Sequence, residues 1–305
     1  MPQATNKHQL HTDKLIKAVL FCVSAHFFFF LMGLGAKYLS ASHHVAEIAF
    51  YRNFIIFAPM LAFILFTKKW HLLHCHKPLL VILRACIGCI TMITVFASLS
   101  YLPMAYATVI FFTSSLITPV LAFFFLKEHV GMHRWSAVAV GMIGVIIIAQ
   151  PSGLISMLGL FLALTAAALH SVVFIMLRAM KTENPITVTL YFLCAGVIIS
   201  GLFFMPWVAQ PILPNQMWLL LLVGLSGGAG QISITSAYKY APASFITPFS
   251  YTALLWNIMA DILYWKYDID LLSIFLGAGL ILNAQILLIY YEHANKNKKQ
   301  KVKKS

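Results

Sequence analysis

The stretch from Tyr101 to Ile148 most constrains what this chain can fold into, because it joins two long apolar runs through a short charged hinge. A helix needs roughly 20 mainly apolar residues to cross a bilayer, and the runs Ala105–Leu126 and Met132–Ile148 reach or approach that length. The hinge between them carries Lys127 and Glu128. The pattern predicts two neighbouring membrane-spanning helices.

Similar apolar runs fill the rest of the chain. Of its 305 residues, 61% are hydrophobic and 10% are charged, and the mean hydropathy is +0.88. This composition excludes a soluble domain folded around one core and indicates a polytopic membrane protein. Breaks between the runs predict ten spans, at 15–36, 45–66, 79–100, 105–126, 132–149, 154–177, 187–208, 217–237, 244–265 and 271–291. The first run is longer than the core of a typical signal peptide, so we expect it to be retained as a span.

The second half of the sequence repeats the first. Five residues recur 139 positions later without a gap: Tyr101, Pro103, Thr108, Thr113 and Lys127 are matched by Tyr240, Pro242, Thr247, Thr252 and Lys266. His26, Met32 and Lys37 likewise recur at His170, Met176 and Lys181. Such self-similarity predicts two structural repeats. We expect a cytoplasmic N-terminal segment at 1–14, five-helix repeats at 15–150 and 154–291, and a basic cytoplasmic tail at 292–305.

The distribution of basic residues predicts the orientation in the membrane. If both termini are cytoplasmic, cytoplasmic segments carry 17 Lys and Arg residues and the outer loops carry only Lys37 and Lys266. Because each repeat has an odd number of spans, the second repeat enters from the opposite face. The predicted fold class is therefore an all-α polytopic membrane protein whose ten transmembrane helices form two inverted five-helix repeats. Inverted repeats typically place a solute site near the bilayer midplane and support alternating access.

The order of several short motifs resembles the EamA-type branch of the drug/metabolite transporter superfamily. The motifs are the acidic residue and arginine of the second span (Glu47, Arg52), the Thr118-Pro119 pair, the exit Leu126–Glu128 and the Gly141, Gly144, Val145 pattern. Nearly the whole chain takes part in the resemblance, which also extends to S-adenosylmethionine uptake carriers. It implies a secondary carrier in the cell inner membrane. The second repeat departs from the pattern, since Tyr267 stands opposite Glu128 and no arginine matches Arg52.

Ionisable residues inside spans are the first candidates for a binding site, because each costs about 2.5–3.5 kcal/mol on insertion scales. Arg52 and Arg84 can hold a carboxylate or phosphate through their forked guanidinium groups. Alternatively, Arg52 pairs with Glu47, and Arg84 reaches the cytoplasmic surface. Asp261 can bind a cationic group or a proton, or can pair with Lys266 at the outer rim.

Histidines and aromatic residues complete the candidate site. His26 and His170 hold matching positions in the two repeats, and the remaining candidates suit a cavity for a flat ring. The expected substrate-binding residues are His26, Arg52, Arg84, Tyr106, Phe112, His170, Gln231, Tyr251, Trp256 and Asp261.

These features predict a secondary transporter of a small polar metabolite, amino-acid-like or nucleoside-like, such as S-adenosylmethionine. We expect no enzyme activity and no cofactor, since the sequence has no phosphate-binding loop and no H-E-x-x-H zinc motif. The net charge of +13 lies mostly in loops and the tail, which favours anionic lipid rather than nucleic acid as a partner. The sequence leaves open whether the protein forms a homodimer. Two alternatives remain: a haem-binding redox protein with His26 and His170 as ligands, and a passive channel or scaffold.

Overall fold

In a computed structural model, the protein consists of helices joined by turns and loops, over the residues that the structure describes, which are 2–114, 116–118, 120–121, 132–148, 156–180, 183–240 and 247–302. In chain order, its elements are α1 (Pro2–Leu39), α2 (Val45–Phe66), η1 (Trp70–Leu73), α3 (Pro78–Tyr101), α4 (Met104–Phe112), α6 (Met132–Ile148), α7 (Met157–Ala179), α8 (Pro185–Ile198), η2 (Ile199–Phe204), α9 (Met205–Val208), α10 (Pro214–Tyr240), η3 (Thr247–Tyr251), α12 (Thr252–Leu263) and α13 (Leu271–Val302). Among the residues of the predicted motifs, Pro119 and Leu126–Glu128 lie outside the described ranges.

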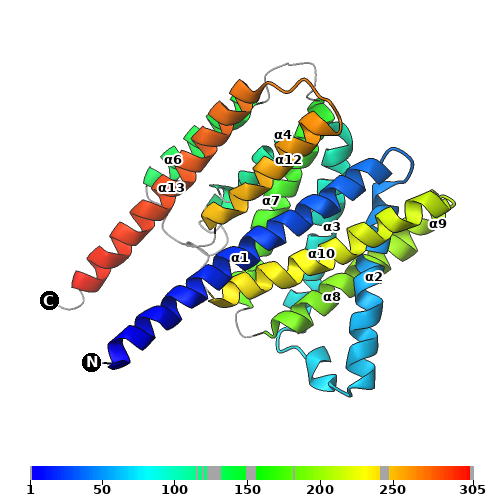
Figure 1. Ribbon diagram of the computed structural model, residues 1–305, viewed down its shortest axis with the longest axis horizontal. Coiled ribbons are helices and arrows are strands. Elements are labelled where there is room, and N and C mark those ends of the chain that lie inside the picture. Colours follow the sequence, from blue (N-terminus) through cyan, green and yellow to red (C-terminus); the bar gives the residue numbers. More distant parts are fainter. Residues whose placement is uncertain are drawn as a thin grey trace. The chain divides into compact units, whose positions relative to one another are not determined.

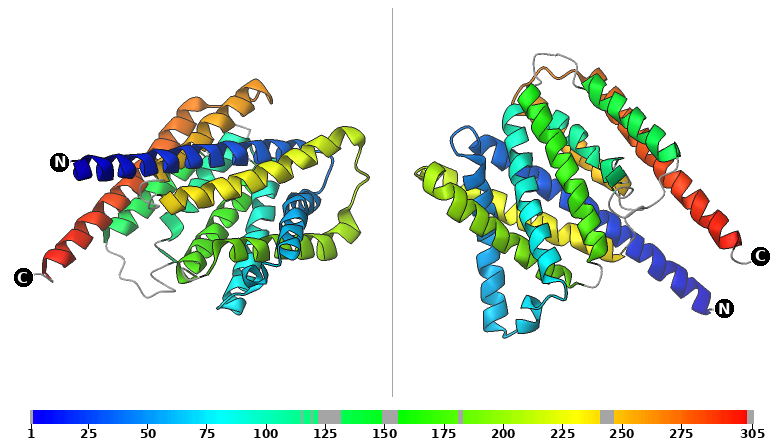
Figure 2. Two further views of the ribbon diagram at one scale, coloured as in Figure 1. Left: turned by 60° about the horizontal axis from the view of Figure 1, so that its bottom comes forward. Right: turned by 180° about the vertical axis from the view of Figure 1, so that it is seen from behind.

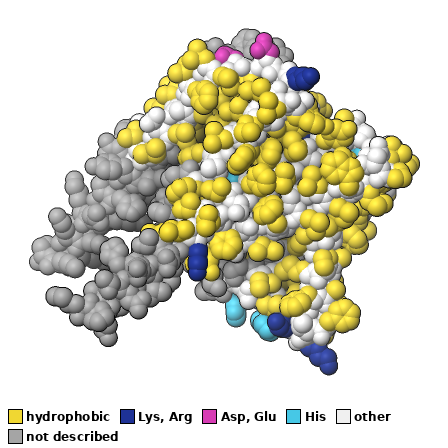
Figure 3. Space-filling view, in the orientation of Figure 1, with side chains coloured by type: hydrophobic (Ala, Val, Ile, Leu, Met, Phe, Trp, Pro, Cys, Tyr) yellow, Lys and Arg dark blue, Asp and Glu magenta, His cyan; other side chains and the backbone are white. Residues whose placement is uncertain are grey.

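The apolar runs fold into helices that suit a bilayer. In the described ranges, six helices are long and apolar enough to cross a membrane: Leu15–Leu39, Val45–Phe66, Pro78–Tyr101, Met157–Leu177, Ile186–Trp207 and Pro214–Ile234. Large apolar side chains cover much of their outer surface, for example Phe66, Leu79 and Trp207. On the face drawn in Figure 3, the described side chains are mainly hydrophobic and only a few charged ones interrupt them. Such a surface is unfavourable in water and suits contact with lipid.

Helix starts follow local capping rules. His44 precedes α2, and its ring nitrogen accepts a hydrogen bond from the Ala46 N–H at 3.3 Å. Asn184 precedes α8, accepts from the Ile186 N–H at 2.9 Å, and is followed by a proline at the first helical position. Both features satisfy backbone donors that a helix N-terminus leaves without partners.

The helix that begins at Pro185 does not stay α-helical. It passes through a π-helical turn, η2, before it continues as α9. The sequence pattern predicted one uninterrupted span at 187–208 and gave no sign of this turn. Single π-turns often lie at functional sites, and η2 packs against α2.

The helices form two compact units. The first comprises Met1–Cys89 and Thr182–Trp265. Within it, α1 and α10 run side by side in opposite directions, and α2 packs against both α10 and α8 (Figure 1). The helix α12 packs on α1 in the same unit.

The second unit comprises Ile90–Lys181 and Lys266–Ser305, so that α3 contributes to both units. In this unit α6 lies along α13, as the views of Figure 2 also show, and α4 packs on α7. At the α6–α13 contact, Gly144 lies against the backbone of Gly277, and a β-carbon on Gly144 would come within 2.7 Å of the Gly277 carbonyl oxygen. The close approach of these two helices therefore requires glycine at 144.

Each compact unit contains helices from both sequence repeats, and the packing is reciprocal. The first helix of one repeat packs on the fourth helix of the other in each unit: α1 on α12, and α7 on α4. The second helices of the repeats, α2 and α8, pack on each other, and so do the fifth helices, α6 and α13. Two similar halves that exchange equivalent contacts produce this arrangement.

Candidate functional site

Two buried arginines of the first unit lie over one aromatic ring. The guanidinium carbon of Arg52, on α2, is 5.5 Å from the centre of the Phe192 ring, and that of Arg84, on α3, is 5.1 Å from the same centre. Both side chains are almost fully enclosed, with exposed fractions of 4% and 9%. A ring face attracts cations, so Phe192 of α8 holds the two positive charges close together.

Small residues of neighbouring helices make room for the Arg52 end of this group. Arg52 Nη1 donates a hydrogen bond to Asn53 Oδ1 at 2.9 Å, and the Asn53 amide donates to the Ala49 carbonyl at 2.8 Å. A β-carbon added at Gly227 of α10 would lie 2.8 Å from Arg52 Nε, and one at Gly196 of α8 would lie 2.2 Å from Asn53 Nδ2. Glycine at these two positions lets the polar side chains enter the helix interface.

Neither arginine has a carboxylate partner among the residues that the structure describes. The alternative in which Arg52 pairs with Glu47 is wrong, because the Glu47 carboxylate instead faces the ring of His43 at 3.0 Å. Arg84 does not extend to the surface either, since it is buried over Phe192. Arg52 Nε, and Arg84 Nε and Nη1, are buried and make no hydrogen bond in this part of the chain. Such donors can still form strong, charge-assisted hydrogen bonds with an anion.

Asp261 of α12 is fully buried. The alternative of a rim pair with Lys266 is wrong: Lys266 is exposed in a left-handed backbone conformation (φ 53°), and no described carboxylate pairs with it. The Asp261 carboxylate and the Lys37 ammonium attract each other instead. Lys37 is not an outer-loop residue, since it lies within α1, and its Nζ is 5.3 Å from the centre of the Trp265 ring.

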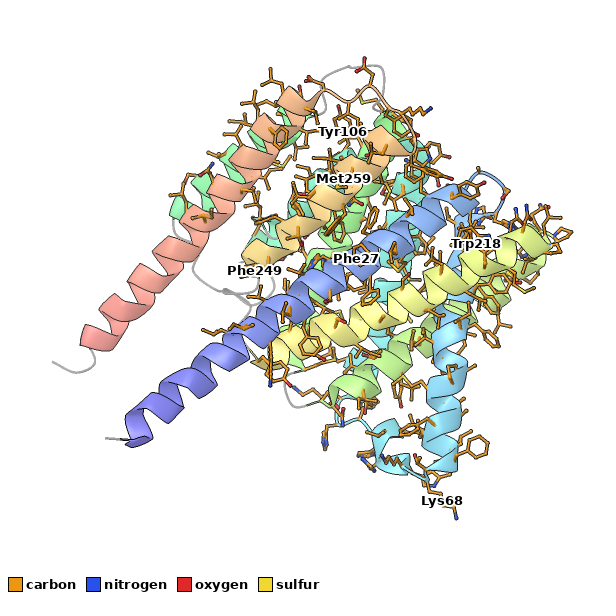
Figure 4. The ribbon with its side chains drawn as sticks, in the orientation of Figure 1. Phe27, Lys68, Tyr106, Trp218, Phe249 and Met259 are labelled. Carbon is orange, nitrogen blue, oxygen red and sulfur yellow. The ribbon has the colours of Figure 1, made fainter. Side chains whose placement is uncertain are left out.

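An aromatic cluster lies where α12 packs on α1. The Trp256 ring is 5.3 Å from that of Phe27, in an edge-to-face arrangement, and 6.5 Å from that of Phe30, in a stacked one. Figure 4 shows Phe27 on α1 and Met259 on α12. The Trp256 indole N–H is buried and has no hydrogen-bond acceptor in the described ranges. The cluster is therefore apolar and aromatic, with one unused donor.

The remaining candidates are distributed over both units. In the first unit, His26 Nδ1 contacts the Cys22 carbonyl oxygen at 2.8 Å, one helical turn earlier, while Gln231 on α10 and Tyr251 at the end of η3 are half-buried. In the second unit, the His170 ring lies 4.8 Å from Phe111 and 4.4 Å from Phe174. Of the other two candidates there, Tyr106 is buried and Phe112 half-buried.

The first unit thus holds His26, Arg52, Arg84, Gln231, Tyr251, Trp256 and Asp261, and the second holds Tyr106, Phe112 and His170. Sequence analysis missed four residues around the arginine pair: Asn53, Phe192, Gly196 and Gly227. Asn53 directly follows Arg52 in an apolar run, a signal that could have been used. Phe192 is one of 24 phenylalanines in the chain and carries no distinguishing pattern.

Comparison with known proteins identifies relatives over most of the chain. The family model described as "EamA-like transporter family" matches residues 16–150 and 157–290. An S-adenosylmethionine uptake transporter of Rickettsia bellii is 27% identical over 268 residues, which are 87% of this chain and 90% of the relative. A riboflavin transporter of Rhizobium johnstonii is 31% identical over 66% of this chain and 67% of its own length.

Two further comparisons cover nearly full lengths. A pseudopaline exporter of Pseudomonas aeruginosa is 25% identical over 90% of this chain and 97% of that protein. A protein of known crystal structure superimposes with a TM-score of 0.61 at 16% identity, over 89% of this chain and 96% of the other. At that identity, the structural likeness supports the fold.

Proposed function

Because the chain belongs to the EamA-like transporter family, we propose that it is a secondary carrier for a small metabolite that bears an anionic group and a flat ring. The carrier lies in the inner membrane with both termini in the cytoplasm. It works by alternating access of two inverted repeats, which agrees with the reciprocal packing of equivalent helices in the two units.

The observation that carries this proposal is the pair of buried guanidinium groups over Phe192. A buried charge without a partner is costly, and breaking a buried ion pair typically costs about 3–5 kcal/mol. A carboxylate or phosphate on the solute would accept hydrogen bonds from the unused N–H donors of Arg52 and Arg84. The solute would thus supply the missing negative charge, and the site would strongly prefer such an anionic solute over a neutral molecule.

The relatives supply candidate solutes. S-adenosylmethionine carries a carboxylate and an adenine ring, so it matches both the arginine pair and the aromatic cluster of Trp256, Phe27 and Phe30. Riboflavin has a flat ring but no carboxylate or phosphate, so it lacks the group that the arginines require. We therefore favour S-adenosylmethionine or an amino-acid-like relative of it over riboflavin.

Exchange of labelled S-adenosylmethionine in proteoliposomes tests the proposal. The purified wild-type protein should exchange external label for internal unlabelled solute in a saturable manner, whereas a passive channel would not show counterflow. Arg52→Ala should reduce exchange by about ten- to a hundredfold, which corresponds to losing a charge-assisted contact of about 1.5–3 kcal/mol. Arg52→Lys should recover part of it, because an ammonium keeps the charge but lacks the planar fork.

The matched control is Lys17→Ala, which removes an exposed cation from α1. It should leave exchange unchanged. Equal exchange by the wild-type protein and by the variants at Arg52 would contradict a role of that side chain in binding. The haem alternative is checked on the same preparation, because a haem bound by His26 or His170 would give a Soret band.

A further inference from the structure

A second buried polar group lies where the turn after α1 meets α10. His43 Nδ1 and Glu47 Oε2 are 3.0 Å apart, and the two residues are only 6% and 1% exposed. On its other side, His43 Nε2 lies 2.8 Å from Gln216 Oε1, close to the start of α10. This group contains none of the residues assigned above to solute binding.

The hydrogen bonds of Gln216 determine where one histidine proton lies. The Leu213 backbone N–H, which can only donate, points at Gln216 Oε1 at 3.1 Å, and Gln216 Nε2 donates to Ser42 Oγ at 3.1 Å. The amide oxygen is therefore the atom that faces His43. Because an amide oxygen only accepts, His43 Nε2 must carry a proton.

The contact with Glu47 then requires one more proton. The 3.0 Å contact between Nδ1 and Oε2 is a hydrogen bond only if a proton lies between these atoms, on either the imidazole or the carboxyl group. Without it, the lone pair of Nδ1 faces a buried carboxylate. Glu47 Oε1 is also buried and has no hydrogen-bond partner in the described ranges. The N-terminus of α2, in whose first turn Glu47 lies, stabilises the negative charge only in part. The pair has a place for one exchangeable proton.

This proton site and the arginine site share one helix interface. Glu47 and Arg52 lie on α2, and Gln216 and Gly227 lie on α10. Between the two sites, α10 approaches α2 through glycine: a β-carbon at Gly224 would lie 2.7 Å from Ile55. The Ile55 side chain thus packs into the space that Gly224 leaves, and the two helices approach closely. Small sliding of closely packed helices is a common form of conformational change, so both the proton and the solute can bias the position of this interface.

We propose that the His43–Glu47 pair is the proton-binding site that couples transport to the proton gradient. This inference rests on the carrier function proposed above. With the proton bound, His43 links α2 to Gln216, and the α2–α10 interface is closed at this end. When the proton leaves to water, the repulsion between Nδ1 and the carboxylate opens this link, and the interface can shift with or without solute at Arg52.

Other titratable groups lie on the same segment and on the packed helices. Tyr51 lies one turn beyond Glu47 on α2 and is close enough to be influenced by its charge. His44, in the turn, receives the Ala46 N–H. On the packed helices, Lys37 of α1 is paired electrostatically with Asp261 of α12, and α10 presents the uncharged amide of Gln216. Asp261 is therefore the rival proton site that the experiment must separate from Glu47.

The first measurement needs no solute. The melting temperature of the purified protein is followed between about pH 5 and about pH 8, the range in which histidine usually changes charge. If the folded state holds the proton between His43 and Glu47, raising the pH should lower the melting temperature of the wild-type protein. In Glu47→Gln and His43→Gln this fall should shrink, whereas Asp268→Asn, which removes an exposed carboxylate, should keep it. An unchanged fall in both variants of the pair would overturn the proposal.

The second measurement uses S-adenosylmethionine in proteoliposomes with an imposed pH gradient. The wild-type protein should accumulate it above the equilibrium level. Glu47→Gln should still exchange labelled for unlabelled solute but should no longer accumulate it. If Glu47→Gln still accumulates the solute, or if only Asp261→Asn loses accumulation, the assignment is wrong.

The two proposals fail in different ways. If the wild-type protein exchanges the solute but a pH gradient does not drive its accumulation, proton coupling is refuted and the carrier function stands. If the wild-type protein does not exchange this solute, the proposed solute is wrong, and the melting curves alone decide whether the pair binds a proton. If Glu47→Gln does not fold, His43→Gln replaces it in both measurements.

Discussion

Lys37 and Asp261 come from opposite ends of the sequence and form an electrostatic pair inside the first unit. Asp261 is fully buried and Lys37 is 7% exposed. The pair lies at the contact of α1 with α12, the contact that also holds the aromatic cluster of Trp256. Its position between two helices of different repeats indicates a role in holding them together.

We therefore predict that Asp261→Asn destabilises the protein without removing gradient-driven accumulation. Removal of one partner leaves the other charge buried, which typically costs about 3–5 kcal/mol. The melting temperature of the purified variant should fall markedly, and Lys37→Gln in the same chain should recover part of the loss. Asp268→Asn serves as the exposed control. A melting temperature equal to that of the control would show that the Lys37–Asp261 pair contributes little.

A second prediction concerns the glycine beside Asn53. Gly196→Ala should displace the Asn53 side chain, because the new β-carbon would lie 2.2 Å from Nδ2. Overpacking of this kind typically costs about 1–3 kcal/mol, and binding should weaken because Arg52 loses its acceptor. Thermal melting and S-adenosylmethionine exchange measure the two effects.

The chain offers a matched control for that substitution. Gly279 lies on α13, and a β-carbon there would meet nothing within 4 Å. Gly279→Ala should raise the melting temperature slightly, since alanine is favoured over glycine in a helix by about 0.5–1 kcal/mol. Equal effects at positions 196 and 279 would mean that the contact with Asn53 is unimportant.

The sequence was sufficient to predict the helical elements, and it singled out Arg52 and Arg84 without deciding whether both are buried. Long apolar runs leave the backbone no other way to satisfy its hydrogen bonds in lipid, so each predicted span overlaps a helix wherever the structure describes it. The fold class is confirmed: this is an all-α polytopic membrane protein with two EamA repeats. Its classification as a transporter rather than an enzyme is confirmed as well.

The ionic partners could not be predicted in the same way. Arg52 follows Glu47 by five residues, which places the two side chains about 140° apart around an α-helix, on different faces. His43 lies in the turn before α2, outside the helix, so helical spacing does not predict its contact with Glu47; the fold of that turn brings the ring to the carboxylate. The partner of Asp261 could not be predicted from local sequence spacing, because Lys37 lies in the other repeat. The π-turn of η2 likewise has no signature in the apolar pattern.

A third prediction tests the orientation of the chain. Gln210 is exposed between α9 and α10, and Lys68 is exposed after α2 at φ 52°; Figure 4 labels it there. In a variant without the native cysteines, a single cysteine at 210 should react with an impermeant maleimide added outside intact cells. A cysteine at 68 should react only after the membrane is opened. The reverse pattern would invert the proposed topology, in which the termini are cytoplasmic.

The last prediction concerns Glu183, which joins the loop before α3 to the segment before α8. Its Oε1 accepts a hydrogen bond from the Lys77 N–H at 2.8 Å, and its Oε2 accepts from the His76 N–H at 3.1 Å. A carboxylate that receives two backbone donors just before a helix start also interacts favourably with the helix dipole. In the first turn of α8, the Thr187 hydroxyl donates to the Leu72 carbonyl at 2.8 Å. These contacts fix a loop of the first repeat to a helix of the second.

Glu183→Gln should therefore release the loop, because a neutral amide has one acceptor oxygen for two donors. Amide hydrogen exchange at His76 and Lys77 should speed up several-fold in the variant, while exchange in the middle of α2 stays slow, since local opening need not involve global unfolding. Thr187→Val should add a similar increase at the end of η1, close to Leu72. Asp268→Asn, a carboxylate substitution outside this contact, should change neither. Unaltered exchange at His76 and Lys77 in Glu183→Gln would show that the loop is held by its apolar contacts, in which Leu72 packs with Ile64 and Leu190.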